Sequence, residues 1–318
     1  MDKINIGLIG LGNWGKNIAR NLQELGALSK IFDINLNENN LNNFESSLIC
    51  KNIDEIIKDQ KIHAVIISSP AKTHKEIAIR ALENNKHIFV EKPFCLSVKE
   101  AQEIIEKSKN YKKKVFVGHL LHYHNGFSKL KDEIKSGLIG NIEIIKANRL
   151  NFGTIRKDES VLYDLSSHDL SMIISLINET PKDIQVNTIF KNSKSHPDII
   201  NAILTFKNNV YAHLNSDWIS PYKEHRFSVL GSKGSLIFDD NQDWGKKLCF
   251  NPSIIDKNFK IKYRENHYIN LIQEEPLKKE MICFLSSIKN DELPITNCME
   301  ALTVQKIMEN IDRKIAHD

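Results

Sequence analysis

A glycine-rich turn near the start of the chain limits the possible folds more than any other feature. Residues 4–9 are typical of a short buried strand, and residues 16–25 are typical of a helix. Gly10, Gly12 and Gly15 lie between them with the spacing G-x-G-x-x-G. In such a turn the first glycine permits the tight bend, the second lets the backbone approach a pyrophosphate, and the third lets the helix pack closely on the strand. Strand, turn and helix together predict a Rossmann dinucleotide site.

Asp33 indicates which dinucleotide is bound. It follows a second predicted strand over residues 28–32, near the position about 20 residues beyond the glycine turn where such sites place a ribose-binding acid. A carboxylate there accepts hydrogen bonds from the adenosine 2′-hydroxyl and repels a 2′-phosphate. Residues 34–37 contain no Arg or Lys. We therefore predict NAD rather than NADP, the alternative being another α/β fold in which Asp33 merely starts a loop.

Length and composition indicate an ordinary globular protein. A chain of 318 residues is long enough for two domains, and 41% of it is hydrophobic. The net charge of +4 is mild, which argues against nucleic acid as a partner. Five scattered cysteines without a C-x-x-C pair argue against disulfides and zinc. Because the first residues lead directly into a strand and no apolar run is long enough for a bilayer, we expect a cytoplasmic protein without a signal peptide.

The first 120 residues alternate between strands and helices. Further strands are predicted at residues 65–67, 87–90 and 115–117, with helices at 35–45, 71–84 and 97–109. Ser97 and Glu100 form a capping box at the start of the last of these helices. With the strand at 115–117 counted as the sixth, we predict a doubly wound parallel sheet of six strands in an NAD-binding Rossmann domain over residues 1–120.

Residues 121–318 follow a different pattern, which predicts an α+β domain with a large, mostly antiparallel open sheet. Its helices are predicted at residues 127–136, 161–177, 274–289 and 299–315, its strands at residues 142–150, 185–190, 199–206, 210–216, 226–230 and 235–238, and a loop at residues 256–266. We expect this domain to bind substrate and to form a homodimer or homotetramer. The predicted contact is the sheet face left without helices, near Tyr211, His213, Leu214 and Trp218.

Three motifs together resemble the glucose–fructose oxidoreductase and inositol dehydrogenase family, the Gfo/Idh/MocA group. They are the glycine turn, the segment 65–74 running on to Glu91-Lys92-Pro93, and residues 164–169, Asp-Leu-Ser-Ser-His-Asp. The resemblance covers essentially the whole chain, and Glu91-Lys92-Pro93 is its most specific part. Within the group, residues 14–17, 149–156 and 161–163 are most similar to the UDP-N-acetylglucosamine 3-dehydrogenase type.

The resemblance implies a catalytic role for Lys92, His168 and Asp164. Lys92 would hold the reacting hydroxyl and help to move its proton, and a cis bond to Pro93 is expected. The near-neutral pKa of histidine suits His168 to proton exchange. Asp164 lies four residues earlier, on the same face if the segment is helical, and would orient the imidazole, with Asp169 as an alternative helper. The competing interpretations are a surface lysine and a core histidine bonded to a carbonyl.

The glycine turn and the resemblance together assign the cofactor site. Glu91 is implied near the nicotinamide end, and the segment after the strand at 65–67 is implied beside the adenosine and the nicotinamide ribose. The predicted cofactor-binding residues are Gly10, Gly12, Asn13, Trp14, Gly15, Asp33, Ser68, Ser69, Pro70, His74, Glu91, Lys92 and Pro93.

Candidate substrate residues are expected in the second domain. A cluster after the strand at 115–117 favours a polar wall for a sugar over a metal site, because no matching carboxylate or cysteine spacing accompanies it. Arg149, Arg156 and Lys157 are candidates for a diphosphate, since arginine presents a rigid donor fork; a solvated face is the alternative. The predicted substrate-binding residues are His119, His122, Tyr123 with the adjacent His124, Arg149, Arg156 and His168.

The resemblance implies NAD-dependent oxidation of the C3 hydroxyl of UDP-N-acetylglucosamine, in amino-sugar or lipopolysaccharide biosynthesis. An aminotransferase would then consume the 3-keto sugar. Other sugars remain open: a UDP-N-acetylhexosaminuronate, a dTDP-ketosugar or a polyol. The alternative from another class is a non-catalytic sensor of NAD or sugar. Lys92 together with His168 argues against it, because a sensor has no need of a catalytic pair.

Overall fold

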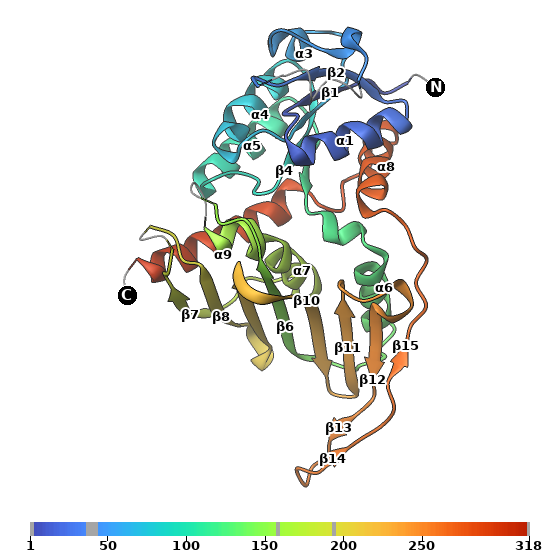
Figure 1. The fold of residues 1–318 in the computed structure, drawn as a ribbon, viewed down its shortest axis with the longest axis vertical. Coiled ribbons are helices and arrows are strands. Elements are labelled where there is room, and N and C mark those ends of the chain that lie inside the picture. The colour runs from blue at the N-terminus through green and yellow to red at the C-terminus, as the bar shows by residue number, and fades with distance from the viewer. Residues whose placement is uncertain (1–2, 36–43, 157–159, 193–194, 317–318) are drawn as a thin grey trace. The chain divides into compact units, whose positions relative to one another are not determined.

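The computed structural model describes residues 3–35, 44–156, 160–192 and 195–316 (Figure 1). The chain forms two compact units, residues 1–120 with 275–305, and residues 121–274 with 306–318. The segment 275–305 therefore packs with the first unit, whereas the sequence placed it in the second domain. Sequence patterns locate helices but do not show which sheet a distant helix covers, and this is why the segment was assigned by its position in the chain.

The sheet of the first unit is parallel, with the strand order β2-β1-β3-β4-β5. Its strands are β1 Ile6–Ile9, β2 Leu28–Phe32, β3 Ala64–Ile67, β4 His87–Glu91 and β5 Val115–Gly118. These are the five strands located from the sequence, and the predicted count of six was wrong: between β2 and β3 the described residues add only an isolated bridge from Ile31 to Ile49. The helix predicted at 35–45 lies largely outside the described residues.

Helices cover both faces of this sheet (Figure 1). They are α1 Asn13–Glu24, α3 Asp54–Ile57, α4 His74–Glu83, α5 Val98–Asn110 and α8 Pro276–Lys289. On one face, α3, α4 and α5 share a hydrophobic core with the strands. On the other, α8 packs against α1 and places Phe284 within 5.5 Å of Phe89 and 5.4 Å of Phe116, measured between ring centroids. The capping box is confirmed, since the Ser97 hydroxyl accepts the Glu100 N–H.

The second unit contains an eight-stranded sheet in the order β15-β12-β11-β10-β6-β9-β8-β7. Its strands are β6 Ile142–Phe152, β7 Asp183–Ile189, β8 Ile199–Thr205, β9 Tyr211–Asp217, β10 Ile219–Gly231, β11 Gly234–Asp239, β12 Leu248–Asn251 and β15 His267–Tyr268. Only β6 and β9 pair in parallel, so the predicted mostly antiparallel sheet is confirmed. The predicted loop at 256–266 instead includes β14 Ile261–Lys262, which forms a hairpin with β13 Ile254–Ile255 and extends away from this sheet (Figure 1).

Helices pack on one face of the large sheet (Figure 1). They are α6 Asn125–Lys135, which contacts β11, and α7 Ser167–Ile177, which contacts β6 and β9; α9 Cys298–Ile315 ends the chain's regular structure. A π-helical turn, Leu162–Ser166, precedes α7. Tyr211 and His213 alternate along β9 with buried residues, so they lie on the face opposite the helices. Leu214 and Trp218, predicted near that open face, are instead buried, with exposures of 0% and 2%.

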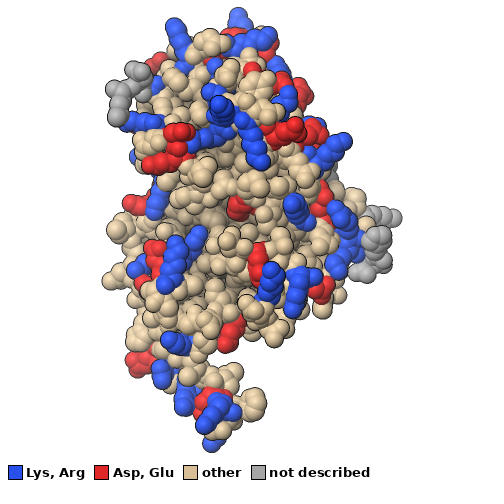
Figure 2. Space-filling view, turned by 180° about the vertical axis from the view of Figure 1, so that it is seen from behind, with Lys and Arg blue, Asp and Glu red and all other residues tan. Residues whose placement is uncertain are grey.

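Charged residues of both signs are interspersed on the visible surface. On the face shown in Figure 2, Lys and Arg side chains are interspersed with Asp and Glu rather than gathered in one stripe. This mixed distribution accompanies the small net charge of +4. Among the residues described, none of the helices combines the length and the apolar character that are needed to cross a bilayer.

Candidate functional site

The three glycines of the turn are required for two different reasons. Gly10 has a φ of +99°, and a Cβ there would lie 2.6 Å from the backbone of Ser68. A Cβ at Gly15 would lie 2.2 Å from the carbonyl oxygen of Gly10, whereas a Cβ at Gly12 would meet no atom within 4 Å. Packing of the chain thus demands glycine at 10 and 15 but not at 12. A glycine at 12 is what close approach of an external group, such as a pyrophosphate, requires.

The start of α1 is open to an anion. The helix begins at Asn13, directly after Gly12, with no capping side chain and no acidic residue in its first turn. Asp33 stands at the end of β2, where its carboxylate accepts the Leu11 N–H at 2.6 Å and the Asn35 N–H at 2.7 Å. An ionised carboxylate has about four acceptor sites, so capacity remains for ribose hydroxyls. A free helix N-terminus and an acid after the second strand are the two groups that a Rossmann fold presents to an adenosine diphosphate, so the geometry is compatible with the predicted site.

The ends of β3 and β4 are tied to the turn and to each other. The Ser68 hydroxyl donates to the Gly10 carbonyl at 2.7 Å. His74 is 1% exposed, with Nδ1 2.9 Å from the Pro93 carbonyl oxygen and Nε2 2.8 Å from that of Ser69. Both ring nitrogens thus contact backbone carbonyls, and His74 links the segment after β3 to the segment after β4. Pro70, predicted with these residues, precedes a short 3-10 turn.

Two charged residues mark the carboxyl end of β4. Lys92 follows the strand, and its peptide bond to Pro93 is cis, as predicted. Glu91 is 8% exposed; its Oε1 accepts the indole N–H of Trp14 at 2.7 Å, and its Oε2 accepts the Lys92 N–H at 3.2 Å. Burial raises the pKa of Glu91 to about 7, against the opposing effects of the Trp14 hydrogen bond and the charges of Lys92 and His119. Perturbed carboxyl groups of this kind are common at functional sites.

The first unit contains a second buried acid, which was not predicted from the sequence. Glu280, on α8, is 0% exposed, and burial together with the negative charge of Glu91 raises its pKa well above the usual value. The sequence feature that could have revealed Glu280 is an acid on the apolar face of a helix, four residues before Phe284. His119, predicted to contact substrate, follows β5 with Nδ1 2.8 Å from Glu300 Oε2, both residues belonging to this unit.

In the second unit, an ion pair anchors the start of α7. Asp169, which follows His168, is 2% exposed. The Arg149 guanidinium donates Nε to its Oδ2 and Nη2 to its Oδ1, both at 2.8 Å. The Arg149 side chain is 11% exposed. Two nitrogens of its donor fork are thus engaged with Asp169; diphosphate binding by Arg149 and a helper role for Asp169 remain predictions.

Asp164 lies in the π-helical turn, so the α-helical spacing behind its predicted role does not apply there. Its Oδ1 lies 3.0 Å from Nε of Arg156, whose side chain is 49% exposed. The guanidinium of Arg156 is therefore held by Asp164 and is at the same time accessible to solvent. Lys157 lies outside the described residues.

The three residues predicted as a polar wall in this unit are nearly buried. His122 is 8% exposed, with Nε2 2.6 Å from the Ser171 hydroxyl, and Tyr123 is 1% exposed. His124 is 4% exposed and stacks on Trp244 with ring centroids 5.0 Å apart. These contacts show how the segment is fixed in the second unit; sugar contact remains a prediction.

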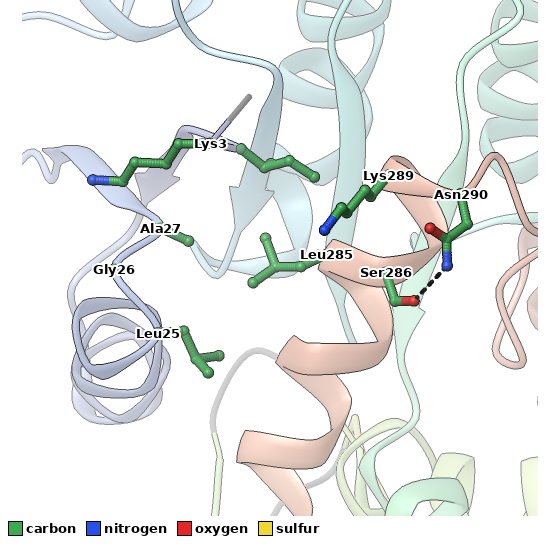
Figure 3. Close-up of a pocket in the computed structure, with 9 residues that line it drawn as sticks. Lys3, Leu25, Gly26, Ala27, Leu285, Ser286, Lys289 and Asn290 are labelled. Atoms are coloured by element: carbon green, nitrogen blue, oxygen red, sulfur yellow. Dashed lines mark hydrogen bonds between the residues drawn. The ribbon is translucent and has the colours of Figure 1, made fainter. Parts of the chain in front are cut away.

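A hollow in the first unit lies at the wrong end of the sheet for a cofactor. It has a volume of about 430 Å³ and is lined by the segment before β1, the end of α1 and the C-terminal part of α8 (Figure 3). Because Ile4 precedes β1, the hollow lies at the amino ends of the strands. Open α/β sheets bind their ligands at the carboxyl ends, where the glycine turn and Lys92 lie.

The first unit thus has the features of a dinucleotide-binding oxidoreductase. The family model described as "Oxidoreductase family, NAD-binding Rossmann fold" matches residues 4–119, and the model of the GFO/IDH/MocA C-terminal domain matches residues 127–237. The chain belongs to the GFO/IDH/MocA oxidoreductase family. The predictions of the family, of an oxidoreductase and of NAD as cofactor are confirmed at this level.

Similar proteins include enzymes with several substrates. The chain is 26% identical over 308 residues to myo-inositol 2-dehydrogenase of Thermotoga maritima, covering 92% of this chain and 90% of that one. It is 26% identical to 2,7-anhydro-N-acetylneuraminate hydratase of Escherichia coli, with 76% and 69% covered. The solved structure of UDP-N-acetylglucosamine 3-dehydrogenase from Acidithiobacillus ferrooxidans superposes with a TM-score of 0.84 at 21% identity, covering 98% and 97%. At that identity the structural match shows the fold alone.

Proposed function

We propose that the protein oxidises the C3 hydroxyl of UDP-N-acetylglucosamine to the 3-keto sugar with NAD. The observation that carries the reaction class is the position of Lys92, directly after the carboxyl end of β4 in an NAD-binding unit. The motif resemblance and the full-length fold match to a UDP-N-acetylglucosamine 3-dehydrogenase support the substrate.

Each proposed residue has a distinct role. NAD, held by the glycine turn and Asp33, would supply the acceptor for the C3 hydride. The Lys92 ammonium holds the reacting hydroxyl and helps to move its proton, and His168 exchanges that proton. Asp164 supplies negative charge in the turn before α7, and the half-exposed Arg156 binds the sugar diphosphate. We also propose sugar contacts for His119, His122 and Tyr123, although each side chain is nearly buried and exposes little surface to a ligand.

The reaction product fits a consuming aminotransferase, since a ketone at C3 is the group that transamination converts to an amine. This places the protein in amino-sugar synthesis, with lipopolysaccharide precursors as the proposed end products. The main rival substrate is a polyol, favoured by the 92% coverage of the match to myo-inositol 2-dehydrogenase.

A substrate panel tests the proposal. The protein with NAD receives UDP-N-acetylglucosamine, its uronate, dTDP-glucose, glucose or myo-inositol, and NADH absorbance is followed with and without an aminotransferase and glutamate. We expect a signal with UDP-N-acetylglucosamine that the trap increases, because removal of the ketone pulls an unfavourable oxidation forward. A signal with only another sugar contradicts the substrate. Silence across the panel despite NAD binding favours a sensor.

We also propose that the open face of the large sheet joins copies of the chain into a homodimer or homotetramer. Ile203 and Tyr211 are 43% and 41% exposed on that face, and His213 pairs with Ile203 in register. A second copy presenting the same residues would cover this apolar surface. Light scattering is expected to give at least a dimer at micromolar concentration, and a monomer would contradict the assignment.

A further inference from the structure

A buried carboxyl group on α8 has no evident packing role. Glu280 is 0% exposed, and neither of its carboxyl oxygens has a hydrogen-bond partner among the described residues. Burying a carboxyl group without a partner costs free energy, even when the group takes up a proton. An apolar side chain of similar size would fit the same place at lower cost. The position therefore calls for an explanation beyond stability.

The packing of α8 directs Glu280 to the end of β4. Phe284, four residues later on α8, lies against Phe89 and Phe116. Residues four apart share one face of a helix, so Glu280 faces the same sheet. Phe89 and Glu91, two residues apart on β4, share one face of that sheet. Glu91 is the charged neighbour whose field acts on Glu280.

The surroundings of Glu91 allow one negative charge. Trp14 on α1 and the Lys92 N–H donate hydrogen bonds to it, and a Cβ at Gly118 on β5 would come within 2.9 Å of its carboxylate. Lys92 and His119, the latter hydrogen-bonded to Glu300 of α9, are the neighbours that lower the pKa of Glu91. Two carboxylates in one buried site repel each other, so the pair gives up one proton far more easily than the second.

We propose that Glu280 is a positioning residue that acts through Glu91: it remains a neutral carboxylic acid and donates its hydrogen to the ionised Glu91 carboxylate. The two groups then hold one proton and one negative charge between them. The donation is open to Glu280 because neither of its oxygens is committed to another described partner. A carboxylic acid kept neutral by its site so that it can donate a hydrogen bond is a known device.

The consequence concerns the redox form of the cofactor, and it rests on the proposed function, which puts the nicotinamide near Glu91. The nicotinamide ring carries a positive charge in NAD+ and none in NADH. One negative charge at the end of β4 therefore favours NAD+. Because only ionised Glu91 supplies that charge, NAD+ binding releases a proton to solvent at pH values where Glu91 is protonated, and NADH binding does not.

Calorimetric titration of the full chain with NAD+ or NADH alone, from pH 5.5 to 9 and in two buffers of different ionisation enthalpy, tests this. In the wild type, NAD+ affinity is expected to rise with pH and to level off above about 7, the pKa of Glu91. The Met side chain in Glu280→Met cannot donate a hydrogen bond, so Glu91 ionises less readily. The pH midpoint of NAD+ affinity is then expected to move up by about one unit, which lowers NAD+ affinity at pH 7 by about fivefold. In Glu280→Gln, whose amide still donates, the midpoint stays within about 0.3 unit.

An unchanged midpoint in Glu280→Met overturns the proposal, as does an equal loss of NAD+ and NADH affinity at every pH, which is the pattern of a purely structural role. Thermal melting is expected to show Glu280→Met folded, since it removes a buried unpartnered carboxyl group. Glu91→Gln supplies an independent check: it must abolish the pH dependence of NAD+ binding. No sugar is present in these titrations, so they are independent of the substrate panel. If the midpoint shifts in Glu280→Met but no sugar of the panel is oxidised, only the proposed function is overturned. If a sugar is oxidised but the midpoint does not shift, only this inference is overturned.

Discussion

Replacement of Lys92 by Met is expected to lower kcat for sugar oxidation by about 10²- to 10⁴-fold, the range associated with loss of a group that transfers a proton in the transition state. The side chain proposed to hold the hydroxyl is lost, while the glycine turn and Asp33, proposed to bind the adenosine diphosphate part, are unchanged. The Kd for NAD+ at pH 8.5 should therefore change by no more than about threefold, since Glu91 is ionised there. Initial rates and calorimetric titration measure the two quantities.

Lys99→Met is the matched control for this variant. Lys99 is exposed in the first turn of α5 in the same unit, and its loss should leave kcat within about twofold. Lys92→Arg keeps the charge but replaces a compact ammonium by a planar fork, so little activity should return. Near-normal turnover in Lys92→Met, with NAD bound, would remove Lys92 from the mechanism.

Replacement of Arg149 by Met is expected to lower the free energy of unfolding by about 3–5 kcal/mol, because it leaves the Asp169 carboxylate buried and uncompensated. Both hydrogen bonds of the pair are 2.8 Å long, and the two side chains are 11% and 3% exposed. Since Asp169 follows His168 in α7, kcat should fall as well. Urea denaturation followed by circular dichroism measures the change in stability.

Two further variants show whether the buried charge is the cause. Arg149→Met combined with Asp169→Asn removes both charges and should recover more than about half of the lost stability. Arg80→Met is the surface control: Arg80 also pairs with an aspartate, Asp54, but the two side chains are 36% and 34% exposed, so its loss should cost about 0–1 kcal/mol. Equal losses in Arg149→Met and Arg80→Met would contradict the assignment.

Most of the fold could be predicted from local sequence patterns. The glycine turn was predictable because its three positions are fixed by local sterics and by one neighbouring strand end, and the structure gives Gly10 and Gly15 those restraints. The alternating segments of the second unit predicted β8 and β9 within a residue. The count of six parallel strands failed, because only five strand segments can be located in residues 1–120, and the described residues after Asp33 add only an isolated bridge.

The site was less predictable, because side-chain partners come from distant parts of the chain. Arg149 is a suitable diphosphate ligand by residue type, and only the packing of β6 against α7 shows that Asp169 occupies its fork. Glu280 lies 189 positions beyond Glu91, so nothing local relates the two acids. Asp164 was placed by α-helical spacing, and a π-helical turn is not visible in a hydrophobic pattern.

The most direct test of the central claim is the fate of a deuterium atom at C3. UDP-N-acetylglucosamine carrying deuterium at C3 is incubated with the protein, NAD, an aminotransferase and glutamate, and the reduced cofactor is analysed by mass spectrometry. Oxidation at C3 predicts that the label moves to the nicotinamide, with a matched substrate labelled at C4 giving unlabelled NADH. Label retained in the sugar while NADH forms, or no NADH from this substrate, would contradict the proposed reaction.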